Sequence, residues 1–465
     1  MRPPPIIQPS QRTDAALAAA AELSAPVPRA PADLSNGAPA KARDARVLNA
    51  TPRLGPFLAL AAQLALLLLV FSVFNLERAG FGRLLAAVFG AFLIHYWIPF
   101  RFKEPFWVAV SVGAAFWLLA PAVAALLMAV GAAFFLTLRS AMALRWRILL
   151  VGAIFTVLAY GRATGTLAIP VAFYPVFGAI FMFRIIIYVY DLAHSRERAR
   201  LLPFLSYFFV LPNYYFTFFP VIDFQTMRRS YYQRDIHEIA QQGIRWMTRG
   251  AIQLALYRLV VYFNDAYLPD LVTTFHALVS TMVLTYLLYM NVSGQFHLIV
   301  GLLHLFGYDL PETNRRYLLA RSLTDFWRRV NIYWKDFMVK IVYFPIYFRF
   351  RKSGEPRAQV VATAAVFVVT WALHIYQSFW LLGKPSLSWP DTLFWTILGL
   401  LVVGNTLYET RHKRQRRGAG WRARAMEAAQ VLGTFTLICT LWSLWSSPTV
   451  NAWVYLMTHW ARSNG

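Results

Sequence analysis

The sequence predicts an all-α polytopic integral membrane protein. We expect about eleven transmembrane helices, with re-entrant or interfacial segments around a central cavity. Of its 465 residues, 58% are hydrophobic and 14% are charged, whereas an ordinary soluble domain has roughly 25% charged residues. Several apolar runs approach the ~20 residues that cross a bilayer as a helix. This composition excludes a soluble enzyme, a disordered scaffold and a disulfide-stapled secreted domain. The runs are continuous, unlike the short alternating segments of a transmembrane barrel.

The chain divides into a membrane domain and two tails. Residues 1–53 hold nine of the 25 prolines and show no hydrophobic periodicity, so we expect a disordered N-terminal tail. Residues 54–447 form the predicted membrane domain, and residues 448–465 form a C-terminal tail. The predicted spans are 55–75, 82–99, 105–119, 121–137, 148–162, 167–190, 271–290, 294–310, 358–383, 391–409 and 427–447.

The strong positive charge indicates an orientation in the bilayer. The chain carries 45 Lys and Arg against 21 Asp and Glu, a net charge of +24. In a membrane protein such residues gather on the cytoplasmic side, where they fix topology and meet anionic lipid headgroups. We therefore expect a lipid partner and no nucleic acid. The basic clusters are 194–200, 227–234, 245–249, 315–329, 349–357 and 411–424.

All six clusters can lie in the cytoplasm, with the N-terminus inside and the C-terminus outside, under one condition. The apolar stretches 203–224, 250–267 and 331–348 must not cross the membrane. Three prolines interrupt the first, Arg258 lies at the centre of the second, and the third contains charged residues and Pro345. Such backbone is tolerated at membrane depth only where it is buried in protein or lines a wet cavity. The pattern is typical of membrane enzymes and transporters.

Few residues in the apolar runs could carry chemistry. The chain has no spacing of Cys and His typical of a metal site and no phosphate-binding loop, and its one cysteine, Cys439, fits a small buried hydrophobe. His374 lies within 358–383, a run with no charged residue. A neutral imidazole there is either a hydrogen-bonded core residue or a general base for a hydroxyl group. His297 and His304 are seven residues apart, and we expect helix-packing hydrogen bonds rather than a metal pair.

A second concentration of polar residues occurs at 325–345. It places Arg328, Arg329 and Asn331 among aromatic residues that include Trp327 and Tyr333. One interpretation is an amphipathic interfacial helix with snorkelling cations. The other is a wet pocket that holds an anionic or thioester-linked substrate.

These two features together resemble the membrane-bound O-acyltransferase family. The run 326–329 reads FWRR, as in the first signature of its bacterial members, and the matching His of the second signature is His374, 43 residues after Asn331. The resemblance extends over 203–408, where an earlier segment with Pro212 and Pro220 is similar to a proline-containing segment of the family. Asn331 replaces the His of the bacterial polysaccharide acylators and is similar to the Asn of the eukaryotic lipid and sterol acyltransferases. Three further residues match the family pattern: Ile332, Tyr343 and Pro345. Five residues depart from it: Val330, Val339, Lys340, Leu373 and Ile375.

The resemblance implies roles for individual residues. His374 would act as general base, and Asn331 would orient or polarise one reactant. Arg328 and Arg329 would hold the loop or meet the phosphates of the donor. Trp327, Tyr333 and Tyr376 would complete the substrate-binding set. No metal and no tightly bound cofactor are implied, and the acyl donor would be acyl-coenzyme A or an acyl-carrier protein.

The expected function is therefore transfer of an acyl group, first of all acetyl, from a thioester to a hydroxyl. An envelope glycan is the first expectation for the acceptor and a lipid the second, in the inner membrane of a bacterium. Two alternatives stay open. One is a transporter or flippase for an acidic or lipid-linked solute, and the other is a catalytically silent relative that scaffolds other membrane proteins.

Overall fold

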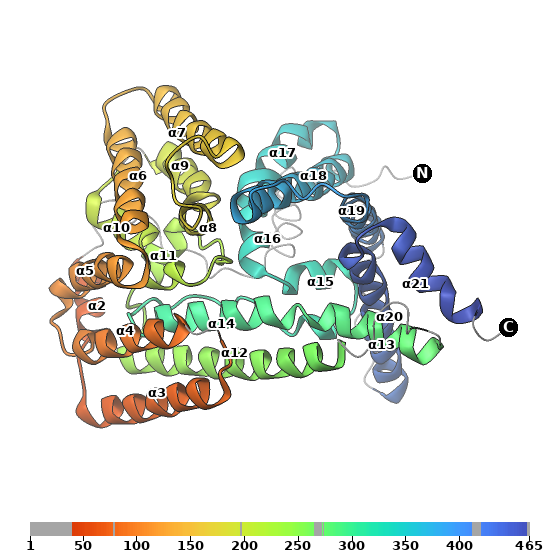
Figure 1. The fold of residues 1–465 in the computed structure, drawn as a ribbon, viewed down its shortest axis with the longest axis horizontal. Coiled ribbons are helices and arrows are strands. Elements are labelled where there is room, and N and C mark those ends of the chain that lie inside the picture. The colour runs from red at the N-terminus through yellow and green to blue at the C-terminus, as the bar shows by residue number, and fades with distance from the viewer. Residues whose placement is uncertain are drawn as a thin grey trace, which may run out of the picture.

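The computed structural model describes residues 40–77, 80–195, 198–264, 272, 274–411 and 420–462. These residues form helices joined by turns and loops, and their only extended pairing is a single bridge between Tyr231 and Tyr308. Figure 1 shows the arrangement. The α-helices are α2 (Ala40–Asn49), α3 (Leu54–Phe74), α4 (Gly80–His95), α5 (Phe100–Leu118), α6 (Pro121–Arg139), α7 (Leu144–Thr164), α8 (Phe173–Phe181), α9 (Arg184–Ser195), α10 (Leu201–Phe208), α11 (Phe224–Ser230), α12 (Ile236–Asn264), α13 (Phe275–Leu287), α14 (Met290–His304), α15 (Leu323–Arg329), α16 (Ile332–Met338), α17 (Phe344–Phe350), α18 (Glu355–Leu382), α19 (Trp389–Arg411), α20 (Trp421–Ser446) and α21 (Val450–Arg462).

Eight helices among the described residues are long and apolar enough to cross a membrane. The protein is thus an all-α polytopic membrane protein, as predicted, while the count of eleven spans is not confirmed. Six of the eight are single helices, and the other two join α8 to α9 and α13 to α14. Their bounds are Leu54–Phe74, Pro121–Arg139, Leu144–Thr164, Phe173–His194, Phe275–His304, Glu355–Leu382, Trp389–Glu409 and Trp421–Ser446.

The predicted reversal of the chain between 271–290 and 294–310 is wrong. The backbone stays in the right-handed helical region at Leu288 and Tyr289, so α13 and α14 continue as one 30-residue stretch. Polar side chains interrupt the apolar run here without ending the helix, because no proline or left-handed residue breaks it. One of them, Ser293, is buried and bonds through its hydroxyl to that of Tyr317 at 3.2 Å.

The stretch 250–267 does not form a separate segment either. Its described part is the second half of α12, a continuous helix of 29 residues, which is not among the eight apolar helices. Helix α12 runs antiparallel to α14, since Gly243 faces Gly301 and Gly250 faces Gly294. The chain therefore leaves the α12 and α13–α14 pair at the end where it entered.

The two helices approach at their backbones. A Cβ atom added at Gly301 would lie 2.6 Å from the carbonyl oxygen of Gly243, and one added at Gly250 would lie 2.7 Å from that of Gly294. Small residues at helix interfaces allow this close packing within a bilayer, where there is no hydrophobic driving force between helices.

We expect Gly301→Ala to destabilise the protein by about 1–3 kcal/mol, the usual cost of overpacking. Its matched control is Gly433→Ala in α20, where an added Cβ meets nothing within 4 Å and where alanine favours the helix by up to about 1 kcal/mol. Thermal denaturation of the purified proteins measures both. An unchanged midpoint for Gly301→Ala would contradict the close approach.

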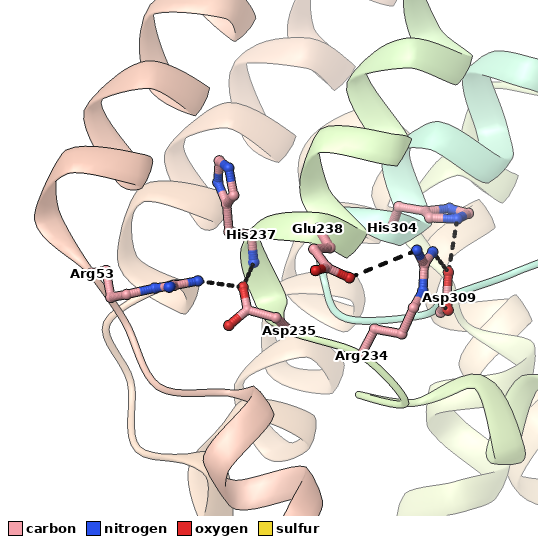
Figure 2. Close-up of polar contacts among 7 residues, drawn as sticks. All are labelled: Arg53, Arg234, Asp235, His237, Glu238, His304 and Asp309. Atoms are coloured by element: carbon pink, nitrogen blue, oxygen red, sulfur yellow. Dashed lines mark hydrogen bonds and ion pairs between the residues drawn. The ribbon is translucent and has the colours of Figure 1, made fainter.

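Polar contacts fasten the end of this helix pair (Figure 2). The side chain of Asp235 accepts a hydrogen bond from the backbone N–H of His237 at 2.9 Å and pairs with Arg53, which precedes α3, at 2.7 Å. Beside it, the Arg234 guanidinium forms a two-point ion pair with Asp309, at 2.5 and 2.7 Å. The loops before α3, before α12 and after α14 are thereby joined.

The predicted tails are partly helical. Helix α2 occupies residues 40–49 of the segment expected to be disordered, and Arg53 is fixed by Asp235. The rest of that segment, residues 1–39, lies outside the described residues. The C-terminal tail contains α21, whose Leu456 packs in a small cluster with Val272, Ala277 and Leu278.

The other two stretches expected not to cross are absent from the eight apolar helices. Residues 203–224 include most of α10 and the 3₁₀ turn η1 (Leu211–Tyr214), and then follow an irregular path. Residues 331–348 contain α16, the π-helical turn η4 (Val339–Tyr343) and the start of α17. Pro345 has no N–H to donate, and the wider π turn lies immediately before it, as such turns do at irregular points in helices.

Candidate functional site

A cavity of about 720 Å³ lies among α13–α14, α15, α16, α18, α19 and α20. The irregular segment 217–221, Pro175 of α8 and Phe183, which lies between α8 and α9, complete its wall. The junction of α13 and α14 contributes Leu288 and Tyr289 to the lining. Both Asn331 and His374 line this cavity, so two residues that are 43 positions apart in the sequence lie at one site.

One face of α15 and α16 is directed to the cavity. Its lining residues recur at a spacing of four: Phe326 and Trp327, Val330 and Asn331, Trp334 and Lys335. The first pair belongs to α15, the second to the turn between the helices and the third to α16. Part of the stretch 325–345 therefore forms a pocket wall, as one of its two interpretations requires.

The same periodicity selects the residues of α18. His374, Gln377, Ser378, Leu381 and Leu382 line the cavity, at offsets of three, four, seven and eight residues. The His374 ring is partly exposed. Its Nδ1 lies 2.8 Å from the carbonyl oxygen of Thr370, which can only accept a hydrogen bond. Nδ1 therefore carries the proton, and Nε2 of the neutral ring keeps its lone pair.

Aromatic rings hold His374 in place. Its ring centroid lies 4.6 Å from that of Trp395, 5.4 Å from Trp334 and 6.3 Å from Trp445. The indole N–H of Trp334 donates to the hydroxyl of Thr370 at 3.3 Å. Thr370 thus binds both His374 and Trp334, and it connects α18 to α16.

Asn331 is fixed by the turn between α15 and α16. Its φ of 45° lies in the left-handed region, which asparagine tolerates better than most residues. The side-chain oxygen accepts from the N–H of Trp334 at 3.2 Å and caps α16, while its own backbone N–H donates to Asn314 at 2.8 Å. The oxygen is thus engaged by the backbone, and the amide NH₂ is the group that can reach a ligand.

Four of the seven predicted site residues do not line the cavity. Arg329 pairs with Asp325 at 2.7 Å, and the hydroxyl of Tyr333 donates to the carbonyl of Pro311 at 2.8 Å. Tyr376 packs beside Phe183 and Trp380. Arg328 is also absent from the lining. These residues fall between the cavity-facing positions of their helices, which explains why proximity in sequence to Asn331 and His374 did not suffice.

Lys335 is the cation of the cavity wall. Its side chain is buried, and its ammonium lies 2.6 Å from the carboxylate of Asp336. Burial raises the pKa of the Asp336 carboxyl, and the neighbouring Lys335 ammonium opposes that rise. The positive charge of Lys335 is therefore already balanced by a carboxylate beside it.

Helices α19 and α20 contribute residues that the sequence did not single out. Asp391, Trp395, Trp442 and Trp445 all line the cavity. The signal that could have found Asp391 is its position: a carboxylate at the very start of the apolar run 391–409.

His297 and His304, the other two histidines considered for chemistry, lie inside the helix packing. His297 and His304 are buried in α14, and each ring bonds through Nδ1 to the carbonyl four residues earlier, at 2.7 and 2.8 Å. Neither lines the cavity. Within the described ranges, no group of three His, Cys, Asp or Glu side chains could hold a metal ion.

No protein-family model and no curated protein matches this chain.

Proposed function

We propose that this protein is a membrane O-acyltransferase that moves an acyl group, first of all acetyl, from a thioester donor to an acceptor hydroxyl. The donor is acyl-coenzyme A or an acyl-carrier protein. The acceptor is a glycan or lipid of the cell envelope, and the protein acts in the inner membrane of a bacterium. The observation that carries the proposal is the meeting of Asn331 and His374 in one cavity.

The chemistry follows from the two side chains. His374 Nε2 accepts the proton of the acceptor hydroxyl as its oxygen attacks the thioester carbonyl. The tetrahedral intermediate carries negative charge on the former carbonyl oxygen, to which the NH₂ of Asn331 can donate a hydrogen bond. The C–S bond then breaks, and the thiolate takes the proton back from His374. The products are an ester and a free thiol.

Two features of the cavity support this chemistry. The Nδ1–H of His374 is already committed to Thr370, so the opposite nitrogen has the lone pair that a general base requires. The surrounding tryptophan rings exclude much of the water that would otherwise compete as acyl acceptor.

The direct test measures thiol release. Purified protein in lipid nanodiscs is mixed with acetyl-coenzyme A, with and without bacterial envelope glycan, and free thiol is followed with a chromogenic reagent. An acyltransferase releases thiol in proportion to ester formed on the acceptor. A transporter binds or moves the solute without releasing thiol, and a silent scaffold binds donor without turnover. The assay is repeated with acetyl and longer acyl groups, each supplied on coenzyme A and on carrier protein. If none of these donors gives thiol release, the proposal is contradicted.

The role of Asn331 predicts a result for Asn331→Asp. Aspartate keeps the oxygen that caps α16 and tolerates the left-handed backbone, but it lacks the NH₂ that donates to the oxyanion. We expect the turnover number to fall by about 10²–10³-fold, the effect of losing one such donor. The thermal midpoint should stay near that of the unmodified protein. Full activity of the variant would show that the amide donates no essential hydrogen bond.

A further inference from the structure

Asp391 belongs to the cavity wall and has one carboxylate oxygen without a hydrogen-bond partner among the described residues. The residue is 8% exposed and lines the cavity at the first turn of α19. Its Oδ1 accepts a hydrogen bond from the indole N–H of Trp445 at 2.7 Å. Its Oδ2 is buried and has no hydrogen-bond partner among the described residues. Leaving a buried polar atom unsatisfied costs about 1–3 kcal/mol, so a ligand that supplies a donor here gains binding free energy.

Neighbouring side chains do not supply that donor. The Lys335 ammonium is engaged by Asp336 at 2.6 Å, and the Nδ1–H of His374 is directed to Thr370. Trp445 uses its single N–H on the other oxygen of the same carboxylate. None of these three groups donates to Oδ2, so this position is open to a donor on a molecule bound in the cavity.

The surroundings favour a neutral donor over a cation. Asp391 lies at the N-terminal end of a 23-residue helix, where the helix dipole stabilises negative charge. Its own backbone N–H is satisfied by the hydroxyl of Ser388 at 3.3 Å. A carboxylate stabilised in this way by the helix and by an indole N–H does not need a full positive charge opposite it. A hydroxyl group is sufficient.

Trp445 relates this carboxylate to His374. The same indole that binds Oδ1 of Asp391 has its ring centroid 6.3 Å from the His374 ring. A molecule lying against this ring can therefore place one hydroxyl at His374 and another at Asp391. Trp395, 4.6 Å from His374 and 5.8 Å from Trp445, provides a second apolar face for its carbon atoms.

We propose that Asp391 is an acceptor-binding residue whose Oδ2 accepts a hydrogen bond from a second hydroxyl, next to the one that is acylated. The site then selects acceptors with two neighbouring hydroxyls over simple alcohols. This inference rests on the proposed acyl transfer for its chemistry, while its binding consequence can be measured separately.

The test compares two probes that differ by one hydroxyl, cyclohexanol and 1,2-cyclohexanediol. With acetyl-coenzyme A as donor, we expect the unmodified protein to use the diol with kcat/KM about tenfold higher or more, the value of one good hydrogen bond to a charged group. In Asp391→Ala that ratio should fall to about one, chiefly through a higher KM for the diol. Asp391→Asn, which keeps the size and an acceptor for Trp445, should lose most of the preference. A ratio that survives in both variants would overturn the proposal.

A control and a second readout separate this inference from the proposed function. The control is Gln359→Leu. Like Asp391, Gln359 has a buried side-chain oxygen without a partner among the described residues, but it lies in α18 and does not line the cavity. This change should leave the ratio of the two kcat/KM values unchanged. Calorimetric binding of the two probes needs no turnover. Tighter binding of the diol that depends on Asp391, in a protein that never releases thiol, would support this subsite and contradict the acyltransferase. Turnover without a preference for the diol would support the acyltransferase and contradict this subsite. A preference for 2-aminocyclohexanol over the diol would show that the ligand is cationic and would overturn the hydroxyl assignment.

Discussion

Replacing His374 with alanine should lower the rate of acyl transfer by about 10²–10⁴-fold, the usual contribution of a positioned general base. The His374 imidazole lines the cavity, and its Nδ1–H donates to the carbonyl of Thr370. Its Nε2 therefore has a free lone pair that can accept a proton. Without it, the acceptor hydroxyl has to attack the thioester with its proton still attached. The loss should appear in kcat more than in the KM for the donor, because the proton transfer occurs in the transition state. Thiol release and ester formation measure it.

The matched control for His374 is His297. Both rings bond through Nδ1 to the carbonyl four residues earlier, at 2.8 and 2.7 Å, in long apolar helices. His297 is buried and does not line the cavity. We therefore compare His374→Gln with His297→Gln, which both retain a polar side chain of similar reach. Only the first should remove activity from protein that remains folded by thermal denaturation. Equal losses in the two variants would indicate that either histidine acts through stability alone.

The general architecture and the central pair of the site follow from the sequence for a simple physical reason. Uninterrupted apolar runs determine helices of bilayer length, and eight such helices occur among the described residues. A lone histidine in an uncharged run and a polar turn amid aromatic residues are both costly at membrane depth, so they indicate a protein interior or a cavity. That reasoning located His374 and Asn331, which line the same cavity.

The features that the sequence does not predict depend on the rotation of helices about their axes and on contacts between distant segments. Tyr333 and Tyr376 lie within two residues of the central pair, yet their side chains face away from the cavity. Apolar residues occur on all sides of α16 and α18. The sequence pattern therefore does not determine how each helix is rotated about its own axis, and so which residues face the cavity. Asp391 could not be placed because its role depends on Trp445, 54 residues later. The joining of α13 and α14 was missed because polar residues such as Ser293 find partners inside the protein.

The second large effect concerns Lys340, which lies in the π-helical turn after α16. Its ammonium forms ion pairs with both Asp191 of α9 and Asp223, the residue that caps α11. Asp191 is 6% exposed. One lysine thus joins the polar wall of the site to α9 and to the end of the proline-rich segment 203–224. Lys340→Met removes the cation of this group and leaves two carboxylates facing each other. We expect a loss of about 3 kcal/mol or more of stability, as for other buried ion pairs broken by removing one partner.

Two comparisons distinguish this mechanism from a general loss of positive charge. Lys352→Met removes an exposed lysine of the 3₁₀ turn η5 (Arg351–Ser353), and the thermal midpoint should hardly change, since exposed charges contribute little. Adding Asp191→Asn to Lys340→Met removes one of the two unpaired charges, so the double variant should be more stable than Lys340→Met alone. In a protein that already contains Lys340, the same Asp191→Asn change should be destabilising. This reversal of sign is the signature of direct coupling between the two residues. If Asp191→Asn destabilised both backgrounds equally, Lys340 would not be holding the carboxylates, and the site wall would depend on the packing of η4 instead.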